Sequence, residues 1–308
     1  MARVGVLLFL ISFSAAAQQV NDPNFRFENP NPAFAQGKGP TVCIDSAHNN
    51  FHTVDGRYKG YAELLRGDGY VVRDSNQKVT PEVLGACQVL LIANPIGDAN
   101  KESWAYPHSS AFARGEIEAV YRWVREGGRL LLFVDHAPVP GAIRDLGALL
   151  GVQLLDGYAA VNPGAVESPD VFRVDDQSLR PHAILAGRNE KEKVDAVATF
   201  TGSAFLAAPA YSPLLVLPSK GVVVTILHMN FEDSPNTDWP AVPAGGLLQG
   251  AARRLGKGRV VIMGEAAMCS AQVAGPEKQP MGMNHPRAAQ NPQFCLNVVR
   301  WLTGVLEP

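Results

Sequence analysis

The residues best suited to chemistry stand at the ends of three apolar runs that are typical of buried β-strands. Asp45, Asp135 and Glu265 each close or directly follow such a run. Open α/β sheets bind their ligands just beyond the carboxyl ends of the strands. We therefore expect the three acids to share one polar site, a cleft at the carboxyl edge of a single sheet.

The first acid is followed by a loop rich in imidazole and amide groups: His48, Asn49, Asn50 and His52. A carboxylate beside imidazoles suits a divalent metal ion or a general acid/base pair. The two histidines would face the same way on a helix, but the neighbouring residues favour a loop, so their spacing alone is a weak indication. The alternative is structural: Asp45 caps a turn and the histidines bond backbone groups.

The other two acids also have polar neighbours. His136 directly follows Asp135, and an acid at the end of so apolar a strand is costly unless it is paired or lies in a cleft. The alternative for Asp135 is that it caps the next helix. The candidate catalytic residues are His48, Asp135, His136 and Glu265.

Two further groups of side chains complete the predicted site. Amides and imidazoles can orient substrate hydroxyls, and a divalent cation takes carboxylate and imidazole ligands. The candidate substrate-binding residues are Asn49, Asn50, His52 and Asn284, and the candidate metal ligands are Asp45, His48 and His136. The sequence has no Gly-x-Gly-x-x-Gly after the first strand and no P-loop, so we expect no nucleotide cofactor.

The four cysteines give no catalytic pattern. A nucleophilic Cys269 would need a base beside it, and the sequence does not place one there. Cys43 falls in a strand pattern and Cys295 in a helix pattern, where cysteine usually serves as a small core residue. The absence of a Cys-x-x-Cys pair disfavours a zinc cluster. A disulfide and its pairing stay open.

Composition and the first residues indicate an exported protein. Residues 1–17 combine a basic start, a short apolar run and an Ala-x-Ala-type end, which is typical of a signal peptide. We expect a periplasmic or extracellular protein without stable membrane insertion after cleavage. The net charge of -2 and the pI of about 6.4 argue against nucleic-acid binding. The oligomeric state stays open.

Hydrophobic periodicity alternates between strands and helices along most of the chain. Residues 18–40 are rich in Asn and Pro and predict a flexible surface arm, and residues 41–303 form one domain. Within it, residues 152–257 predict an irregular, β-rich insertion or elaboration. We expect strands near 41–45, 69–73, 88–93, 129–135, 222–229 and 259–264, and helices near 57–66, 113–126, 141–150 and 290–303. This order predicts an α/β fold with a mostly parallel sheet covered on both faces.

Several of these segments resemble the class I glutamine amidotransferase-like superfamily, in particular an exported bacterial branch of unknown function. The chain is also similar to trehalose-utilisation (ThuA-like) proteins. The resemblance covers residues 40–303 and implies a flavodoxin-like three-layer sandwich. It rests on Asp45-x-x-His48-Asn-Asn, Gly127-Gly128-Arg-Leu-Leu-Leu-Phe-Val-Asp135-His136, Gly256-Lys-Gly-Arg-Val-Val-Ile-Met-Gly264-Glu265 and Asn297-Val-Val-Arg-Trp301-Leu302.

The resemblance also bears on activity. True amidotransferases carry a nucleophilic cysteine at the turn where this sequence has Asp135-His136, so a cysteine-dependent glutaminase is not expected. ThuA-like relatives place a histidine there, which implies His136 as a site residue and a sugar or another small polar ligand. Two hypotheses result. One is an exported metal-assisted or acid/base hydrolase of a carbohydrate-like substrate, and the other is a non-catalytic binding or interaction domain that lost the nucleophile.

Overall fold

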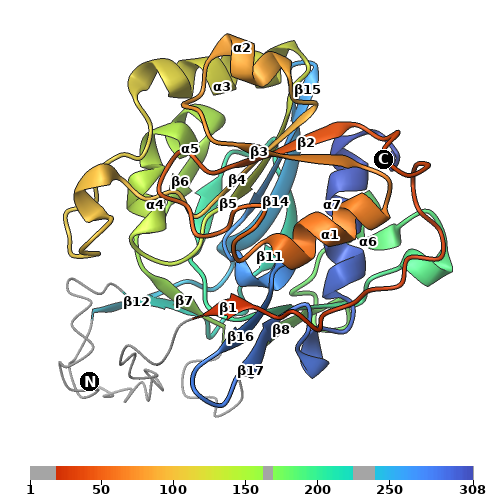
Figure 1. The fold of residues 1–308 in the computed structure, drawn as a ribbon. Coiled ribbons are helices and arrows are strands. Elements are labelled where there is room, and N and C mark those ends of the chain that lie inside the picture. Colours follow the sequence, from red (N-terminus) through yellow and green to blue (C-terminus); the bar gives the residue numbers. More distant parts are fainter. Residues whose placement is uncertain (1–18, 162–168, 225–239, 308) are drawn as a thin grey trace.

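The computed structural model describes residues 19–161, 169–224 and 240–307. A nine-stranded mixed sheet forms its centre (Figure 1), in the order β3-β2-β4-β5-β15-β14-β10-β6, with β11 also paired to β14. Its strands are β2 (Thr41–Asp45), β3 (Val71–Ser75), β4 (Val89–Ala93), β5 (Arg129–Phe133), β6 (Val152–Leu154), β10 (Phe205–Ala207), β11 (Ser212–Val216), β14 (Leu248–Leu255) and β15 (Gly258–Met263). The first five in the sheet order are parallel and the others antiparallel.

Helices cover both faces of the parallel half, as Figure 1 shows. One face carries α1 (Lys59–Gly67) and α7 (Asn291–Leu302), and the other carries α2 (Pro81–Gly85), α3 (Arg114–Glu126) and α5 (Arg144–Leu150). Side chains alternate between the faces of a strand. Leu131 and Phe133 of β5 therefore pack in the first helix layer, and Leu130 and Leu132 in the second. The predicted flavodoxin-like three-layer α/β sandwich is confirmed.

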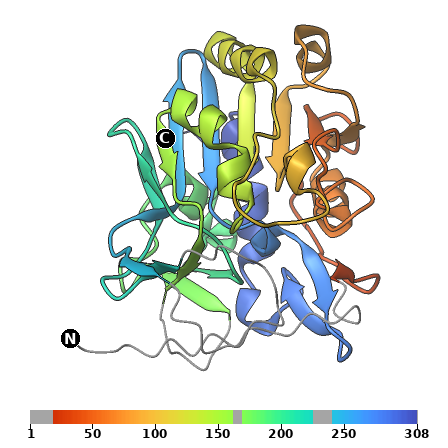
Figure 2. The ribbon, with the colours of Figure 1, turned by 90° about the vertical axis from the view of Figure 1, so that its left-hand side faces the viewer.

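Small sheets lie at the end of the central sheet where the parallel strands finish, the lower end in both Figure 1 and Figure 2. They are β1 (Val20–Asn21) with β16 (Ala271–Ala274) and β17 (Gln279–Gly282), β7 (Tyr158–Ala160) with β12 (Val222–Val224) and β13 (Ala241–Pro243), and β8 (Asp170–Arg173) with β9 (Ala196–Thr199). The short helices are α4 (Val139–Ala142), α6 (Ala183–Ala186), η1 (Asp98–Asn100), η2 (Glu190–Glu192), η3 (Ala267–Cys269) and η4 (Pro286–Ala288). Among the helices of the described residues, none is both long enough and apolar enough to cross a membrane.

The predicted elements differ from the observed ones in a few places. The strand expected at 69–73 begins at Val71, because Gly69 adopts φ +91° in the turn that follows α1. The helix expected at 141–150 is divided into α4 and α5 at Ile143. The strand expected at 222–229 is described over 222–224, and its remainder lies outside the described residues, as do residues 1–18. The segment 152–257 contributes β6, β10, β11 and β14 to the main sheet.

The segment from residue 19 to residue 40, expected to be a flexible arm, packs along the body of the molecule. Its strand β1 pairs with β16. Phe25, Phe27 and Phe34 pack against the core beside α1 and α7. The apolar side chains explain this attachment, because they lie between the Asn and Pro residues that made the segment look like a linker.

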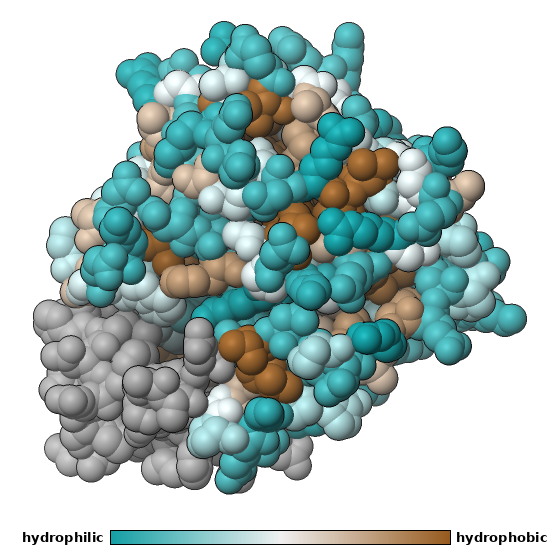
Figure 3. Space-filling view, viewed as in Figure 1, coloured by the Kyte–Doolittle hydropathy of each residue, from teal (hydrophilic) through white to brown (hydrophobic). Residues whose placement is uncertain are grey.

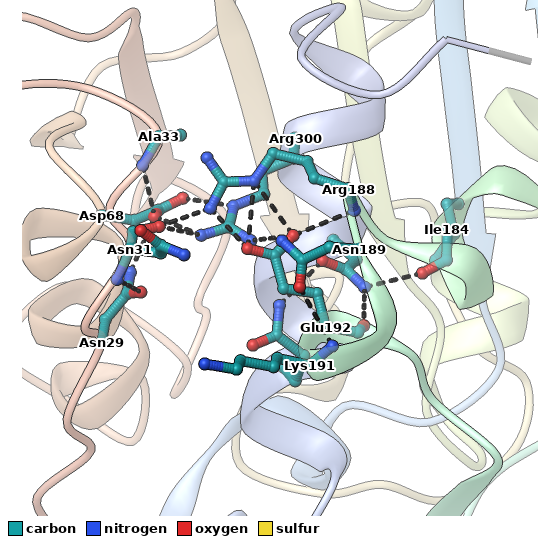
Figure 4. Close-up of polar contacts among 12 residues, drawn as sticks. Asn29, Asn31, Ala33, Asp68, Ile184, Arg188, Asn189, Lys191, Glu192 and Arg300 are labelled. Atoms are coloured by element: carbon teal, nitrogen blue, oxygen red, sulfur yellow. Dashed lines mark hydrogen bonds and ion pairs between the residues drawn. The ribbon is translucent and has the colours of Figure 1, made fainter.

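A buried ion network holds the same segment in place (Figure 4). Asp68 and Arg300 are fully buried, and Nη2 of Arg300 donates to Oδ1 of Asp68 at 2.6 Å. The Asp68 carboxylate also accepts hydrogen bonds from Asn29 Nδ2 and the Ala33 amide, while Arg300 donates to the Asn31 carbonyl. Removing one partner of a buried pair typically costs about 3–5 kcal/mol, so this network ties the segment firmly to α7.

All four cysteines lie among the described residues and form two disulfides, Cys43–Cys87 and Cys269–Cys295. The interpretation of Cys43 and Cys295 as core residues is correct for their burial but misses their bonds. The pairing depends on three-dimensional proximity, which spacing along the chain does not reveal. With all four sulfurs paired, no thiol is available as a nucleophile.

Candidate functional site

Four polar side chains follow four neighbouring parallel strands at one edge of the sheet. Asp45 ends β2, Asn94 follows β4, Asp135 comes two residues after β5, and Glu265 two residues after β15. All four are buried. Because the carboxyl ends of parallel strands meet at one edge, the structure gathers these groups where ligands bind in such sheets. Their hydrogen bonds nevertheless divide them into two groups with different roles.

The first group is a closed cluster around His48. Nδ1 of His48 lies 2.8 Å from Oδ1 of Asp45, and Nε2 lies 3.0 Å from Oε1 of Glu116 in the first turn of α3. The imidazole is fully buried. His48 is therefore the centre of a buried hydrogen-bonded triad that fastens the loop after β2 to α3.

Glu116 has further partners that keep it ionised. Burial by itself would raise the pKa of this carboxyl, but hydrogen bonds from the Ala113 and Val79 amides and from His48 lower it below its ordinary value. The triad is thus fully hydrogen-bonded within the protein. In this arrangement both ring nitrogens of His48 face carboxylates of the protein. The catalytic role predicted for His48 and the metal-ligand roles predicted for Asp45 and His48 stay predictions.

The amides predicted to bind substrate hold loops instead. Nδ2 of Asn50 donates to Asp45 and to the Ala93 carbonyl, and Nδ2 of Asn49 donates to the Ile96 carbonyl and to Asp98. Asn284 lies at the β1–β16–β17 sheet, where its Nδ2 donates to Asp22 at 3.0 Å and to the Gln272 carbonyl at 2.8 Å. In each case the amide nitrogen is committed to the protein, because loops need side-chain partners for their backbone groups.

The second group contains Asp135 and Glu265. The Asp135 carboxylate accepts from Asn94 Nδ2 at 3.0 Å and from the His136 amide at 2.8 Å. Glu265 is fully buried and accepts from the amides of Ala267 and Met268, both at 2.7 Å. Burial, followed by the neighbouring Asp135 charge, raises the pKa of Glu265 well above its ordinary value. Such a perturbed acid is typical of a functional site.

His52 lies beside this second group and has no hydrogen bond. Its ring is 2% exposed, and both nitrogens are buried without a partner. The ring stands edge-on to Tyr58, with centroids 4.7 Å apart. Burial, then the charges of Arg57 and His136, lower the pKa of His52 well below 6.5, so the ring is neutral at pH 7. It carries one N–H donor and one lone pair, both unused.

Arg57 is the cation closest in sequence to this histidine and precedes the first residue of α1 by two positions. Its guanidinium lies over the Phe51 ring, 4.9 Å from the centroid. Burial lowers the pKa of Arg57, while the Asp135 charge raises it. Within the described part of the chain, the guanidinium makes no hydrogen bond or ion pair. Buried or half-buried arginines usually have such partners.

Aromatic rings frame the group. The His136 ring stacks on Tyr158 with centroids 4.4 Å apart and an interplanar angle of 14°. Trp104 lies 6.1 Å from His136 and 6.3 Å from Phe51, measured between centroids. Nδ1 of His136 lies 2.7 Å from the Ala137 carbonyl and donates to it, which leaves Nε2 without a hydrogen bond to the described residues. We call Phe51, His52, Arg57, Trp104, Asp135, His136, Tyr158 and Glu265 the edge site.

The sequence reasoning finds part of the edge site. It includes His52, Asp135, His136 and Glu265 but misses Arg57, Trp104 and Tyr158. Position could have indicated Arg57, which lies in the loop between the first strand and the first helix, the kind of loop that forms ligand sites. Trp104 and Tyr158 carry no such signal, because they reach the site from a long loop and from the irregular segment.

Neither a metal cluster nor a deep pocket coincides with the edge site. In the described ranges, no three His, Cys, Asp or Glu side chains are grouped to hold a metal ion. A pocket of about 450 Å³ lies between Asp176, Arg180 and Gly246, and one of about 400 Å³ lies beside the Cys43–Cys87 disulfide. The expected cleft is thus neither of these two pockets, and the half-buried side chains of Arg57 and His136 give solvent its access to the edge site.

Comparisons with known proteins address the fold. No family model matches the chain, and no curated protein matches it. The N-terminal domain of mmIFT52 is similar with a TM-score of 0.60 and 13% identity, over 85% of this chain and 97% of that one. A cytoplasmic protein from Salmonella typhimurium gives 0.48 and 11%, over 86% and 99%. A ThuA-like protein from Bacteroides uniformis gives 0.46 and 15%, over 90% and 94%. At its identity, the likeness to mmIFT52 concerns the fold alone.

Proposed function

We propose that the protein binds a small, polar, carbohydrate-like ligand at the edge site. The observation that carries this proposal is His52, whose two ring nitrogens are buried without a partner among the described residues, near the charges of Arg57 and His136. An unsatisfied buried polar group costs about 1–3 kcal/mol, and proteins retain such groups mainly where they serve a function. A ligand with hydroxyl groups can both donate to and accept from this imidazole.

The aromatic frame supports the same ligand class. Trp104 and the stacked pair of His136 and Tyr158 offer flat apolar faces, and the polar groups of Asp135 and His52 lie next to them. Binding sites for small molecules combine apolar walls with a few convergent polar groups. The face of the molecule in Figure 3 is mostly hydrophilic, with its hydrophobic groups small and separate.

A second candidate function is acid/base hydrolysis of that ligand. His136 favours it, because its ring is part-exposed and its Nε2 has no hydrogen bond to the described residues. His136 would exchange the proton with the substrate, and Asp135, bonded to the His136 amide, would supply negative charge beside it. Glu265 is a buried acid whose two oxygens face backbone amides, so its role would be to set the charge around Asp135. Without a free cysteine, thioester chemistry of the amidotransferase type is not part of this proposal.

We also propose export to the periplasm or the outside of the cell. Two disulfides fit an oxidising compartment. The expected signal peptide at residues 1–17 lies outside the described residues. Membership of the class I glutamine amidotransferase-like superfamily remains part of the proposal, supported by the flavodoxin-like sandwich and by the position of Asp135-His136 after β5.

Calorimetric titration with glucose, galactose, xylose and cellobiose tests the binding proposal, and release of nitrophenol from matching nitrophenyl glycosides tests hydrolysis. We expect binding to be lost in His136→Ala and retained in His285→Ala, which removes a part-exposed histidine ring that packs on Phe200. Turnover that disappears in His136→Ala would establish the hydrolase. Equal binding by the two variants, or no binding of any polar ligand by the wild type, would refute the edge site as the binding site.

A further inference from the structure

We propose that the ligand of the edge site carries a carboxylate, which Arg57 binds, so that the preferred ligand class is a sugar acid. This inference rests on the proposed function and specifies its ligand. The observation behind it is a half-buried guanidinium without a hydrogen bond or ion pair in the described residues, beside a neutral histidine whose two nitrogens are also unused. The two side chains come from one short loop between β2 and α1.

Other arginines in comparable surroundings are satisfied by the protein. Arg300 pairs with Asp68 and Glu192, Arg188 with Glu192, and Arg259 with Glu307. Among the described residues, the Arg57 guanidinium contacts the Phe51 ring, which lies against one face of its plane and uses none of its N–H groups. The guanidinium presents its donors in a planar fork that fits a carboxylate with two parallel hydrogen bonds.

Asp135 does not take this place. Its carboxylate is oriented by Asn94 Nδ2 and the His136 amide, and it forms no ion pair with Arg57. It is close enough for its charge to raise the pKa of Arg57, so it helps to keep the guanidinium protonated. Burial and the Asp135 charge raise the pKa of the neighbouring Glu265 carboxyl, which lessens the negative charge around Asp135.

His52 adds a second donor for the same group. The neutral ring offers one N–H, and the charges of both Arg57 and His136 influence it. Both ring nitrogens are buried and have no hydrogen bond among the described residues, so the imidazole holds one unused N–H and one unused lone pair near the guanidinium. The rings of Trp104 and Tyr158 both pack against His136.

Calorimetric titration of the whole protein with galacturonate and with its methyl ester tests this inference, since the two differ in the carboxylate charge. Galactose serves as the neutral reference. The variants are Arg57→Gln, Arg57→Lys and Lys59→Gln, the last being an exposed cation two residues away that controls for net charge. Circular dichroism and the thermal midpoint establish that each variant is folded.

We expect galacturonate to bind the wild type about tenfold to a hundredfold more tightly than the ester, as charged hydrogen bonds do. This preference should vanish in Arg57→Gln, weaken in Arg57→Lys, which keeps the charge but loses the fork, and persist in Lys59→Gln. Equal binding of the acid and the ester, or an acid preference that survives Arg57→Gln, would overturn the inference and leave the binding proposal intact. Failure of galacturonate, ester and galactose alike to bind would overturn both.

Discussion

Nε2 of His48 lies 3.0 Å from Oε1 of Glu116, across 68 residues of sequence, while Nδ1 of the same ring lies 2.8 Å from Asp45. The loop that follows the first strand of the sheet is in this way fixed to the first turn of α3. The same loop continues to His52 and Arg57, so the triad positions the part of the edge site that these two residues form.

Replacement of His48 by leucine should therefore destabilise the fold severely. The change leaves two buried carboxylates facing an apolar side chain, and loss of one member of a buried ionic group costs about 3–5 kcal/mol. Urea denaturation at pH 7 measures the loss. Lys59→Gln, at an exposed position of α1, should change the free energy of unfolding by less than about 0.5 kcal/mol. A His48→Leu protein within about 1 kcal/mol of the wild type would contradict the buried triad.

The stability of the protein should fall as the pH drops from 6.5 towards 4 because of His182. This residue caps α6, where its Nδ1 accepts the Ile184 amide at 3.1 Å, and burial lowers its pKa to about 4. In that interval His182 is protonated in the unfolded chain but stays neutral in the folded protein, so a falling pH favours unfolding. Above pH 6.5, the ordinary pKa, the contribution is fully present.

The variant His182→Asn provides the matched comparison for this pH dependence. Asparagine keeps a side-chain acceptor at the helix start but does not titrate. Urea midpoints measured from pH 7.5 to pH 4 should therefore decline less steeply in the variant than in the wild type. Parallel curves for the two proteins would show that His182 does not titrate differently in the folded and unfolded states.

Each disulfide should contribute about 3–4 kcal/mol to stability, from loops of 26 and 44 residues. The double variants Cys43→Ser with Cys87→Ser, and Cys269→Ala with Cys295→Ala, separate the two contributions in urea denaturation. The variant without the Cys269–Cys295 bond should be compared most closely with the wild type, because Cys269 is the last residue of η3. The η3 residues Ala267 and Met268 donate their amide hydrogens to Glu265. Alkylation of the unfolded, unreduced protein followed by mass measurement should detect no free thiol. Any modified cysteine would disprove the pairing.

The sequence was sufficient for the sheet and its helices but only partly for the site. Runs such as Val89–Ala93 and the stripe of α3 have strong periodicity, and local pattern determines them. Their order along the chain then implies the parallel sheet and the edge at which Asp135 and Glu265 meet. These inferences concern the positions of residues at the sheet edge, which follow from the order of strands and helices alone.

What a side chain contacts was harder to predict. His48 and His136 look alike in sequence, each one to three residues after an acid at a strand end. Glu116, 68 residues further along, encloses the first ring, and Tyr158 stacks on the second while leaving it part-exposed. The same holds for Asn49, Asn50 and Asn284, each of which donates to a carboxylate and to a backbone carbonyl. Most of these partners are distant in the sequence and leave no local signal.

The pairing of Asp68 with Arg300 has a consequence for the order of events during folding. Asp68 lies at the end of α1, and its partner arrives 232 residues later in α7. The Asn31 carbonyl, which Arg300 also contacts, comes from the opposite end of the sequence. Until α7 has been synthesised, the amino-terminal part of the chain lacks Arg300, the partner of the Asp68 carboxylate. Because Asp68 is fully buried in the folded protein, the core around it stays incomplete until then. Long-range closure of this kind is slow, and it favours a chain that stays loosely folded until synthesis has nearly finished.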